Sequence, residues 1–289
     1  MLNVISYQPV NEKNTFTNGD CVSGAVTLEL AKECEMESLM IKFKGKAEVL
    51  WTERYGQTTH VYHSKDKYFS IKHYFFGGKD LRGEWADSLR RLMIQHRCSS
   101  ALRNTPSSFT GSVGKIVYSL EAKLSRSMRI PTKDSTTINF VTKEDFTSHP
   151  ELMTPQHESK DKKMKILNSG MVAMDLNLEK TGFFQGEGLK VLACIQNNST
   201  RNIKPKYCVY RKHSFFAQGK RKCSTKDLLK EVGEPIVPSA TEKFTKVIPI
   251  PLDAEPSILN CSIIKAEYRL RVKPMSNYGH QLPPRNREA

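Results

Sequence analysis

The stretch Ile41–Trp51, with the sequence IKFKGKAEVLW, decides the fold because its residues alternate in character. The odd positions are apolar or small, and Lys42, Lys44, Lys46 and Glu48 stand between them. A period of two predicts a β-strand with one buried face and one solvated face. The solvated face of this strand is expected to be basic.

The same alternation recurs along the chain and predicts an all-β protein. Turn-forming pairs such as Gly77-Gly78 separate the alternating runs, which lie at 22–30, 116–124, 174–178, 189–195 and 264–272. Many short strands with turn signals and few helical stretches are typical of a β-sandwich.

The second half of the chain resembles the first. FTNGDCVSGAVTLEL, near residue 16, is similar to FFQGEGLKVLACI, near residue 183, and SVGKIVYSLEAKLSR (112–126) is similar to CSIIKAEYRLRV (261–272). Such a repeat predicts two immunoglobulin-like sandwiches in tandem. We expect domains at 1–150 and 166–273, joined by a polar, proline-punctuated linker at 151–165.

Two segments depart from this pattern. Within 81–105, apolar residues and one histidine recur every three or four positions, at Leu81, Trp85, Leu89, Met93 and His96. That spacing predicts a helix-like segment inside the first β domain. Residues 274–289 are polar and rich in Pro and Asn, and we expect them to be disordered.

The charge balance points to an anionic partner. The 289 residues include 45 Lys+Arg and 30 Asp+Glu, a formal net charge of +15, which favours lipid headgroups, phosphorylated peptides or nucleic acid. Nucleic acid is the weakest choice because the basic clusters lack interleaved aromatic residues. The candidate binding residues are Lys42, Lys44, Lys46, Arg211, Lys212, Lys220, Arg221 and Lys222. Each cluster could equally be the solvated face that keeps a strand soluble.

Motifs for catalysis, cofactors and metals are not found. Gly111–Lys115 (GSVGK) lacks the spacing and the following Ser/Thr of a phosphate loop. His60, His63 and His73 could bind a metal only at a turn, because strand positions three apart face opposite sides. We therefore expect a protein that is not an enzyme and binds no cofactor or metal.

The remaining composition favours the cytoplasm. The chain has no apolar run near the ~18 residues of a membrane span, and its start lacks the basic and apolar regions of a signal peptide. Its seven cysteines form no CxxC pair, as is typical of reduced thiols in a cytosolic protein.

Several strings together resemble the α-arrestins, the arrestin domain-containing proteins, and are similar to the vertebrate arrestin domain-containing 3-like group. They are FTNGDCVSGAVTLEL, SLMIKFKGKAEVLWTE, PSSFTGSVGKIVYSLEAKLSR and EPSILNCSIIKAEYRLRV. The resemblance implies a non-catalytic adaptor at the plasma membrane and endosomes. It would bind cytoplasmic tails of membrane receptors and cargo, contact anionic membrane peripherally, and recruit WW-domain HECT ubiquitin ligases for endocytosis and lysosomal sorting.

The chain departs from the family pattern in three places. The segment 81–105 stands where the family has a loop and a Pro/aromatic-rich strand, and the family continues beyond Val272, so the second sandwich is expected to be incomplete. Pro283-Pro284 is followed by Arg285, so the sequence has no PPxY ligase motif. The alternatives are a retromer-like coat subunit, or a truncated decoy that binds cargo without a ligase.

Overall fold

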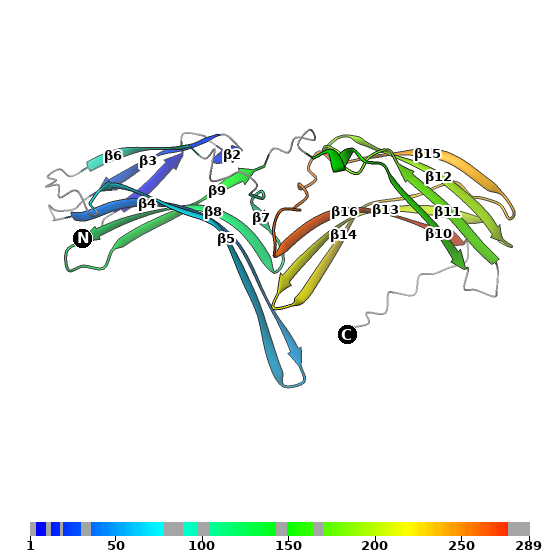
Figure 1. Ribbon diagram of the computed structural model, residues 1–289, viewed down its shortest axis with the longest axis horizontal. Coiled ribbons are helices and arrows are strands. Elements are labelled where there is room, and N and C mark those ends of the chain that lie inside the picture. The colour runs from blue at the N-terminus through cyan, green and yellow to red at the C-terminus, as the bar shows by residue number, and fades with distance from the viewer. Residues whose placement is uncertain are drawn as a thin grey trace. The chain divides into compact units, whose positions relative to one another are not determined.

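The computed structural model describes residues 4–9, 13–17, 20–29, 36–77, 89–97, 105–142, 149–163 and 170–276. Strands form almost all of the regular structure in these residues, which confirms the all-β prediction. No helix in the described residues is long and apolar enough to span a membrane. The chain divides into two compact units, each of which is a sandwich of two sheets (Figure 1). Unit 1 comprises Met1–Lys143, His213–Ser224 and Ser257–Glu267, and unit 2 comprises Glu144–Lys212, Thr225–Pro256 and Tyr268–Ala289.

The larger sheet of unit 1 carries the stretch that decides the fold. Its order is β2 (Thr15–Thr17), β9 (Thr132–Val141), β8 (Gly114–Arg126), β4 (Met36–Tyr55) and β5 (Thr58–Phe76), with β7 (Phe109–Thr110) also paired to β8. The pairing of β4 with β8 ends at Val49, whereas β4 and β5 stay paired as far as Tyr55 and Thr58. The two strands therefore continue beyond β8 as a two-stranded arm (Figure 1).

The smaller sheet of unit 1 corrects the helix expected within 81–105. Its order is β1 (Val4–Pro9), β3 (Cys21–Glu29) and β6 (Leu89–Arg97). β6 pairs antiparallel with β3 over its whole length, so residues 89–97 form a strand. Leu92, Met93 and Ile94 are three apolar residues in a row, which fit a period of two as well as a helical period. Residues 81–88 and 98–104 lie outside the described part of the chain.

The core of unit 1 includes residues from the second half of the sequence. Phe215, Cys261 and Ile264 are buried in the same cluster as Phe43 and Tyr118 of the larger sheet. The hydroxyl of Tyr68 donates a hydrogen bond to the Cys261 sulfur at 3.2 Å, and the Ser262 hydroxyl donates one to Asp66 at 2.7 Å. Unit 1 is therefore completed by 213–224 and 257–267, which a single division along the chain would assign to the second domain.

Unit 2 contains a strand where the composition predicted a linker. Its first sheet has the order β10 (Gln156–Lys163), β11 (Gly170–Leu178), β12 (Gly188–Ser199) and β15 (Thr241–Pro249). Residues 150–153 form the 3-10 turn η2, and β10 pairs antiparallel with β11 along its length. β10 is an edge strand whose residues 156–161 are all exposed, so it has no apolar alternation that a sequence pattern could reveal.

The second sheet has the order β14 (Lys220–Val232), β13 (Ile203–Ala217) and β16 (Ile264–Ser276). In unit 2 it packs Ile203 and Tyr207 into two buried clusters, against Ile195 and Ile248 respectively. β16 continues to Ser276, so the first residues of the expected disordered tail belong to a strand. Residues 277–289 lie outside the described part.

Candidate functional site: the lysine face of unit 1

The predicted basic strand face is present on β4. Ile41 and Phe43 are 4% and 2% exposed, whereas Lys42, Lys44 and Lys46 are half-buried on the opposite side of the strand. The alternation arises because successive side chains of a strand point to opposite faces of the sheet. The three lysines therefore share the face of the larger sheet that points away from the core.

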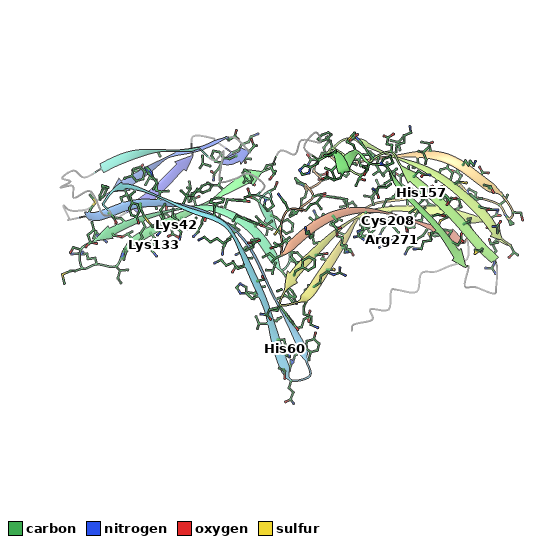
Figure 2. The ribbon with its side chains drawn as sticks, in the orientation of Figure 1. Lys42, His60, Lys133, His157, Cys208 and Arg271 are labelled. Carbon is green, nitrogen blue, oxygen red and sulfur yellow. The ribbon has the colours of Figure 1, made fainter. Side chains whose placement is uncertain are left out.

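Neighbouring strands enlarge this basic surface. The register places Lys72 of β5 opposite Lys42, and Lys67 opposite Lys46. On the other side, Lys123 of β8 pairs with Lys133 of β9. The lysine face is defined here as Lys42, Lys44, Lys46, Lys65, Lys67, Lys72, Lys115, Lys123 and Lys133. Figure 2 shows Lys42 and Lys133 on this part of unit 1.

Two carboxylates interrupt the lysine face and pair with its central members. Lys44 Nζ lies 3.0 Å from Glu121 Oε2, and Lys46 Nζ lies 2.5 Å from Glu48 Oε2. The hydrogen bond from Lys46, helped by one from His63, lowers the pKa of Glu48 to about 2. The hydrogen bond from Lys44, helped by the nearby charges of Lys42 and Lys133, lowers the pKa of Glu121.

The lysines at the margins of the face keep their charge unpaired. Within the described residues, Lys42, Lys67, Lys72, Lys123 and Lys133 have no carboxylate at ion-pair distance. On the lysine face as a whole, lysines outnumber carboxylates, so this face carries a net positive charge. It can attract an anionic segment, and it offers no nucleophile with an adjacent base for covalent chemistry.

The second predicted cluster is divided between the units. Arg211 and Lys212 belong to unit 2, whereas Lys220, Arg221 and Lys222 belong to unit 1. The side chain of Arg211 is 16% exposed, and its Nη1 lies 2.7 Å from the Glu255 carboxylate. This arginine stabilises unit 2 through that ion pair and is poorly placed to bind a partner.

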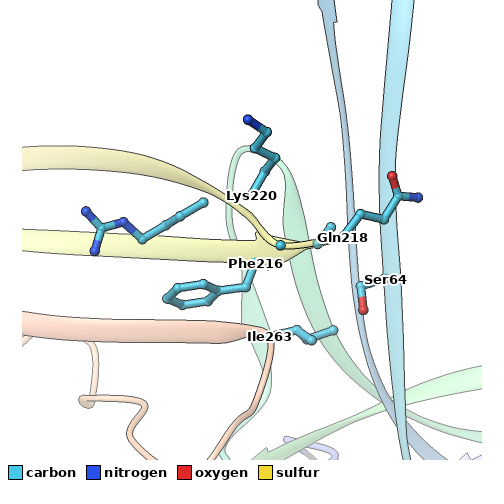
Figure 3. A pocket seen from close by; sticks show the side chains of 8 residues that line it. Ser64, Phe216, Gln218, Lys220 and Ile263 are labelled. Atoms are coloured by element: carbon cyan, nitrogen blue, oxygen red, sulfur yellow. The ribbon is translucent and has the colours of Figure 1, made fainter. Parts of the chain in front are cut away.

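Residues 220–222 follow the tight turn between β13 and β14. Gln218 and Gly219 have φ angles of 51° and 73°, as a two-residue hairpin turn with the twist of its strands requires. The turn borders an open hollow of about 460 Å³ whose lining includes Ser64, Ile263 and the exposed Lys220 (Figure 3). Its apolar floor and cationic rim contain no acid–base pair.

The described residues were also compared with what a metal site or a reactive thiol requires. No group of three His, Cys, Asp or Glu side chains there is placed to hold a metal ion. Cys194, Cys208, Cys223 and Cys261 are free thiols. Burial raises the pKa of the Cys208 thiol, which disfavours the reactive thiolate.

The lysines of β5, β8 and β9 were missed by sequence reasoning. Lys65 and Lys67 alternate in the segment KDK and could have been noticed. The strand order that places them beside Lys46 is set by long-range pairing, which no local pattern reveals.

Comparison with known proteins agrees with this architecture. The arrestin (or S-antigen) N-terminal domain matches residues 5–147, and the arrestin (or S-antigen) C-terminal domain matches residues 168–283. Arrestin domain-containing protein 4 of Mus musculus is 26% identical over 271 residues, and that of Homo sapiens is 27% identical over 269 residues. Both alignments cover 90% of this chain and 64% of the relative, so the chain spans just under two-thirds of their length. Thioredoxin-interacting protein of Rattus norvegicus is 24% identical over 266 residues, covering 90% of this chain and 66% of that protein. With an N-terminal and a C-terminal arrestin domain in succession and relatives among the α-arrestins, the chain belongs to the arrestin family.

Proposed function

We propose that this protein is a trafficking adaptor that binds acidic cytoplasmic segments of membrane proteins on the lysine face of unit 1. Proteins of the arrestin family are non-catalytic adaptors, and the family match supports the same general role here. The adaptor would act peripherally at the plasma membrane and endosomes and direct bound cargo to endocytic sorting. This role does not require a ligase contact within residues 1–289, which contain no PPxY.

The observation that carries the proposal is the excess of lysines over carboxylates on one face of the larger sheet. Neighbouring strands lie about 4.8 Å apart, so cations on adjacent strands form closely spaced rows. Lys72 and Lys42 make one such row, and Lys67 and Lys46 make another. An acidic segment that crosses these rows meets two cations in the first row and Lys67 in the second, where Lys46 is already paired with Glu48. A neutral segment gains no comparable attraction.

The edge of the sheet suggests how such a segment binds. Among the strands that the structure describes, β4 is the one paired with β5, so in that part of the chain the other edge of β5 is available to an added strand. An extended peptide that pairs with β5 would place alternate side chains on the lysine face, beside Lys67 and Lys72. Acidic residues at every second position of the peptide would then give the strongest binding.

The proposal is tested with fluorescently labelled acidic peptides in which Glu occupies every second position. The triple variant Lys42→Gln, Lys67→Gln, Lys72→Gln removes three cations that have no ion-pair partner within the described residues, so the fold should be preserved. If each cation contributes about 0.5–1 kcal/mol, the dissociation constant should rise roughly tenfold or more at low salt.

A charge-matched control distinguishes this face from overall charge. Lys226, Lys243 and Lys273 are exposed in unit 2, and their change to Gln removes the same net charge. If both triple variants weakened peptide binding equally, the lysine face would be rejected as the binding site. Unchanged peptide binding by the Lys42→Gln, Lys67→Gln, Lys72→Gln variant would reject it as well. Localisation of tagged protein on endosomes after cargo stimulation tests the trafficking role separately.

A further inference from the structure

The turn between β8 and β9 exposes two large apolar side chains. It comprises residues 127–131, with the sequence SMRIP, and joins Arg126 to Thr132. Met128 is 102% exposed and Ile130 is 89% exposed, so neither side chain packs against the fold. Turns of soluble proteins are usually built from small or polar residues. The apolar character of this turn therefore calls for a contact outside the folded chain.

The backbone of the turn does not explain the choice of methionine. Met128 has a φ of 50°, in the left-handed region that glycine and asparagine adopt more readily. The amide of Arg129 bonds to the carbonyl oxygen of Arg126 at 3.4 Å, so the turn is closed by its own backbone. A polar residue at position 128 would fit the turn equally well. The exposed side chain of Met128 therefore contributes nothing to the folding of unit 1.

Cations surround the apolar turn. Arg126 is the last residue of β8, at the base of the turn, and Arg129 lies within the turn. Lys123 and Lys133 stand opposite each other at the adjoining ends of β8 and β9. Figure 2 places Lys133 at this end of unit 1. Among the described residues at this end of the sheet, Glu37 and Asp134 are the carboxylates and Lys123, Arg126, Arg129 and Lys133 are the cations, so cations outnumber carboxylates in that part of the chain.

We propose that the β8–β9 turn is a membrane anchor that inserts Met128 and Ile130 into the interface of an anionic bilayer. Apolar side chains at the tip reach the acyl boundary, while the surrounding Arg and Lys side chains remain at the level of the phosphates. A hydrophobic pocket on a protein would bind the apolar tip but would have no need for the excess of cations around it. The bilayer is therefore the occupant that both features fit.

This anchor goes beyond the proposed binding of acidic segments, which uses Lys42, Lys67 and Lys72 on β4 and β5. The two activities can fail separately. Loss of the apolar tip, Met128 and Ile130, should leave the affinity for soluble acidic peptides unchanged, and loss of those three lysines should leave insertion of the turn unchanged.

The test is cosedimentation of the full chain with vesicles of phosphatidylcholine containing 30 mol% phosphatidylserine, compared with phosphatidylcholine alone. The variant Met128→Asn, Ile130→Ser removes the apolar tip, and Asn tolerates the left-handed backbone at position 128. Each inserted apolar side chain is worth roughly tenfold in affinity, so loss of both should weaken binding about a hundredfold. Arg129→Gln with Lys133→Gln should abolish most of the preference for phosphatidylserine.

Two further measurements keep the result unambiguous. Val232 and Val237 of unit 2 are 58% and 54% exposed, so Val232→Ser with Val237→Ser is a matched control that should bind vesicles normally. An Ile130→Trp variant should show added fluorescence quenching by lipids with brominated acyl chains, above that of the parent chain. Failure of the parent chain to bind anionic vesicles, or normal binding by the Met128→Asn, Ile130→Ser variant, would overturn the proposal. If the Met128→Asn, Ile130→Ser variant lost its affinity for acidic peptides but still bound vesicles, the proposal would also be overturned, and the apolar tip would be a contact for a protein partner.

Discussion

Replacement of Phe215 by alanine tests whether the second half of the chain completes unit 1. The Phe215 side chain is fully buried in β13 and belongs to the core cluster of unit 1. Its ring lies beside that of Phe109, with centroids 6.4 Å apart, and covers Gly111 and Gly114, where an added Cβ would come within 2.9 Å and 2.7 Å of it. Alanine would leave a large cavity at a place where two glycines cannot fill the space.

The expected cost is about 4 kcal/mol, within the 3–5 kcal/mol typical of buried Phe→Ala changes. Amide hydrogen exchange resolved by peptide is the suitable assay, since it reports each unit without assuming a single unfolding transition. A loss of about 4 kcal/mol corresponds to roughly a thousandfold faster exchange when opening is rapid and reversible. That acceleration should appear in β4 and β8.

Ile248→Ala provides the matched control. Ile248 is 1% exposed in β15 and packs with Val191 and Tyr207 in a cluster of unit 2. Its replacement should accelerate exchange in β12 and β15 by a similar mechanism. If Phe215→Ala accelerates exchange only in those unit 2 strands and spares β4 and β8, the assignment of residues 213–224 to unit 1 is wrong.

Three further predictions concern stability. Gly45→Ala should lower the free energy of unfolding by about 2 kcal/mol, because the new Cβ would lie 2.7 Å from the ring of the buried Tyr118; an unchanged melting temperature would contradict this. Asn197→Ala should cost about 3 kcal/mol in denaturant titration, because this buried amide donates to the carbonyl oxygens of Arg201 at 2.8 Å and Ile236 at 3.0 Å; a loss below 1 kcal/mol would show that water replaces these bonds. Glu48 has its pKa lowered from 4.5 to about 2, so the stability it provides is complete above pH 4.5 and is lost as the pH falls toward 2. Glu48→Gln should therefore reduce the acid sensitivity of unfolding between these two pH values, and an identical pH profile would show that the ion pair with Lys46 is energetically silent.

The sequence predicted those parts of the fold in which one face of a strand is buried. The alternation at Ile41–Trp51 is reproduced by the burial of every second residue. The same reasoning failed for β6 because Leu92-Met93-Ile94 fits two periods at once, and for β10 because an exposed edge strand buries neither face. In both cases pairing with a neighbouring strand decides the structure, and that partner is distant in sequence.

The composition of unit 1 shows a different limit of sequence reasoning. Phe215, Cys261 and Ile264 are apolar in either unit, and a local pattern cannot say which core they join. The tertiary contacts of Cys261 with Tyr68 and of Ser262 with Asp66 carry that information. The repeat of two sandwiches was visible in the sequence, whereas the contribution of the second half to the first unit was not.

The lysine face also shows why a site found from one strand is incomplete. Lys44 and Lys46 are central in the sequence pattern, yet Glu121 and Glu48 already pair with them. Reversal of Lys44 to Glu would place two carboxylates at about the distance of the present ion pair, and the repulsion would destabilise unit 1 whether or not the face binds a partner. Lys42, Lys67 and Lys72 can be neutralised without breaking an ion pair within the described residues, so their loss reports on binding alone. The residues most informative about function are therefore Lys42, which the sequence pattern identified, and Lys67 and Lys72, which the register adds, since the central lysines Lys44 and Lys46 serve the fold as well.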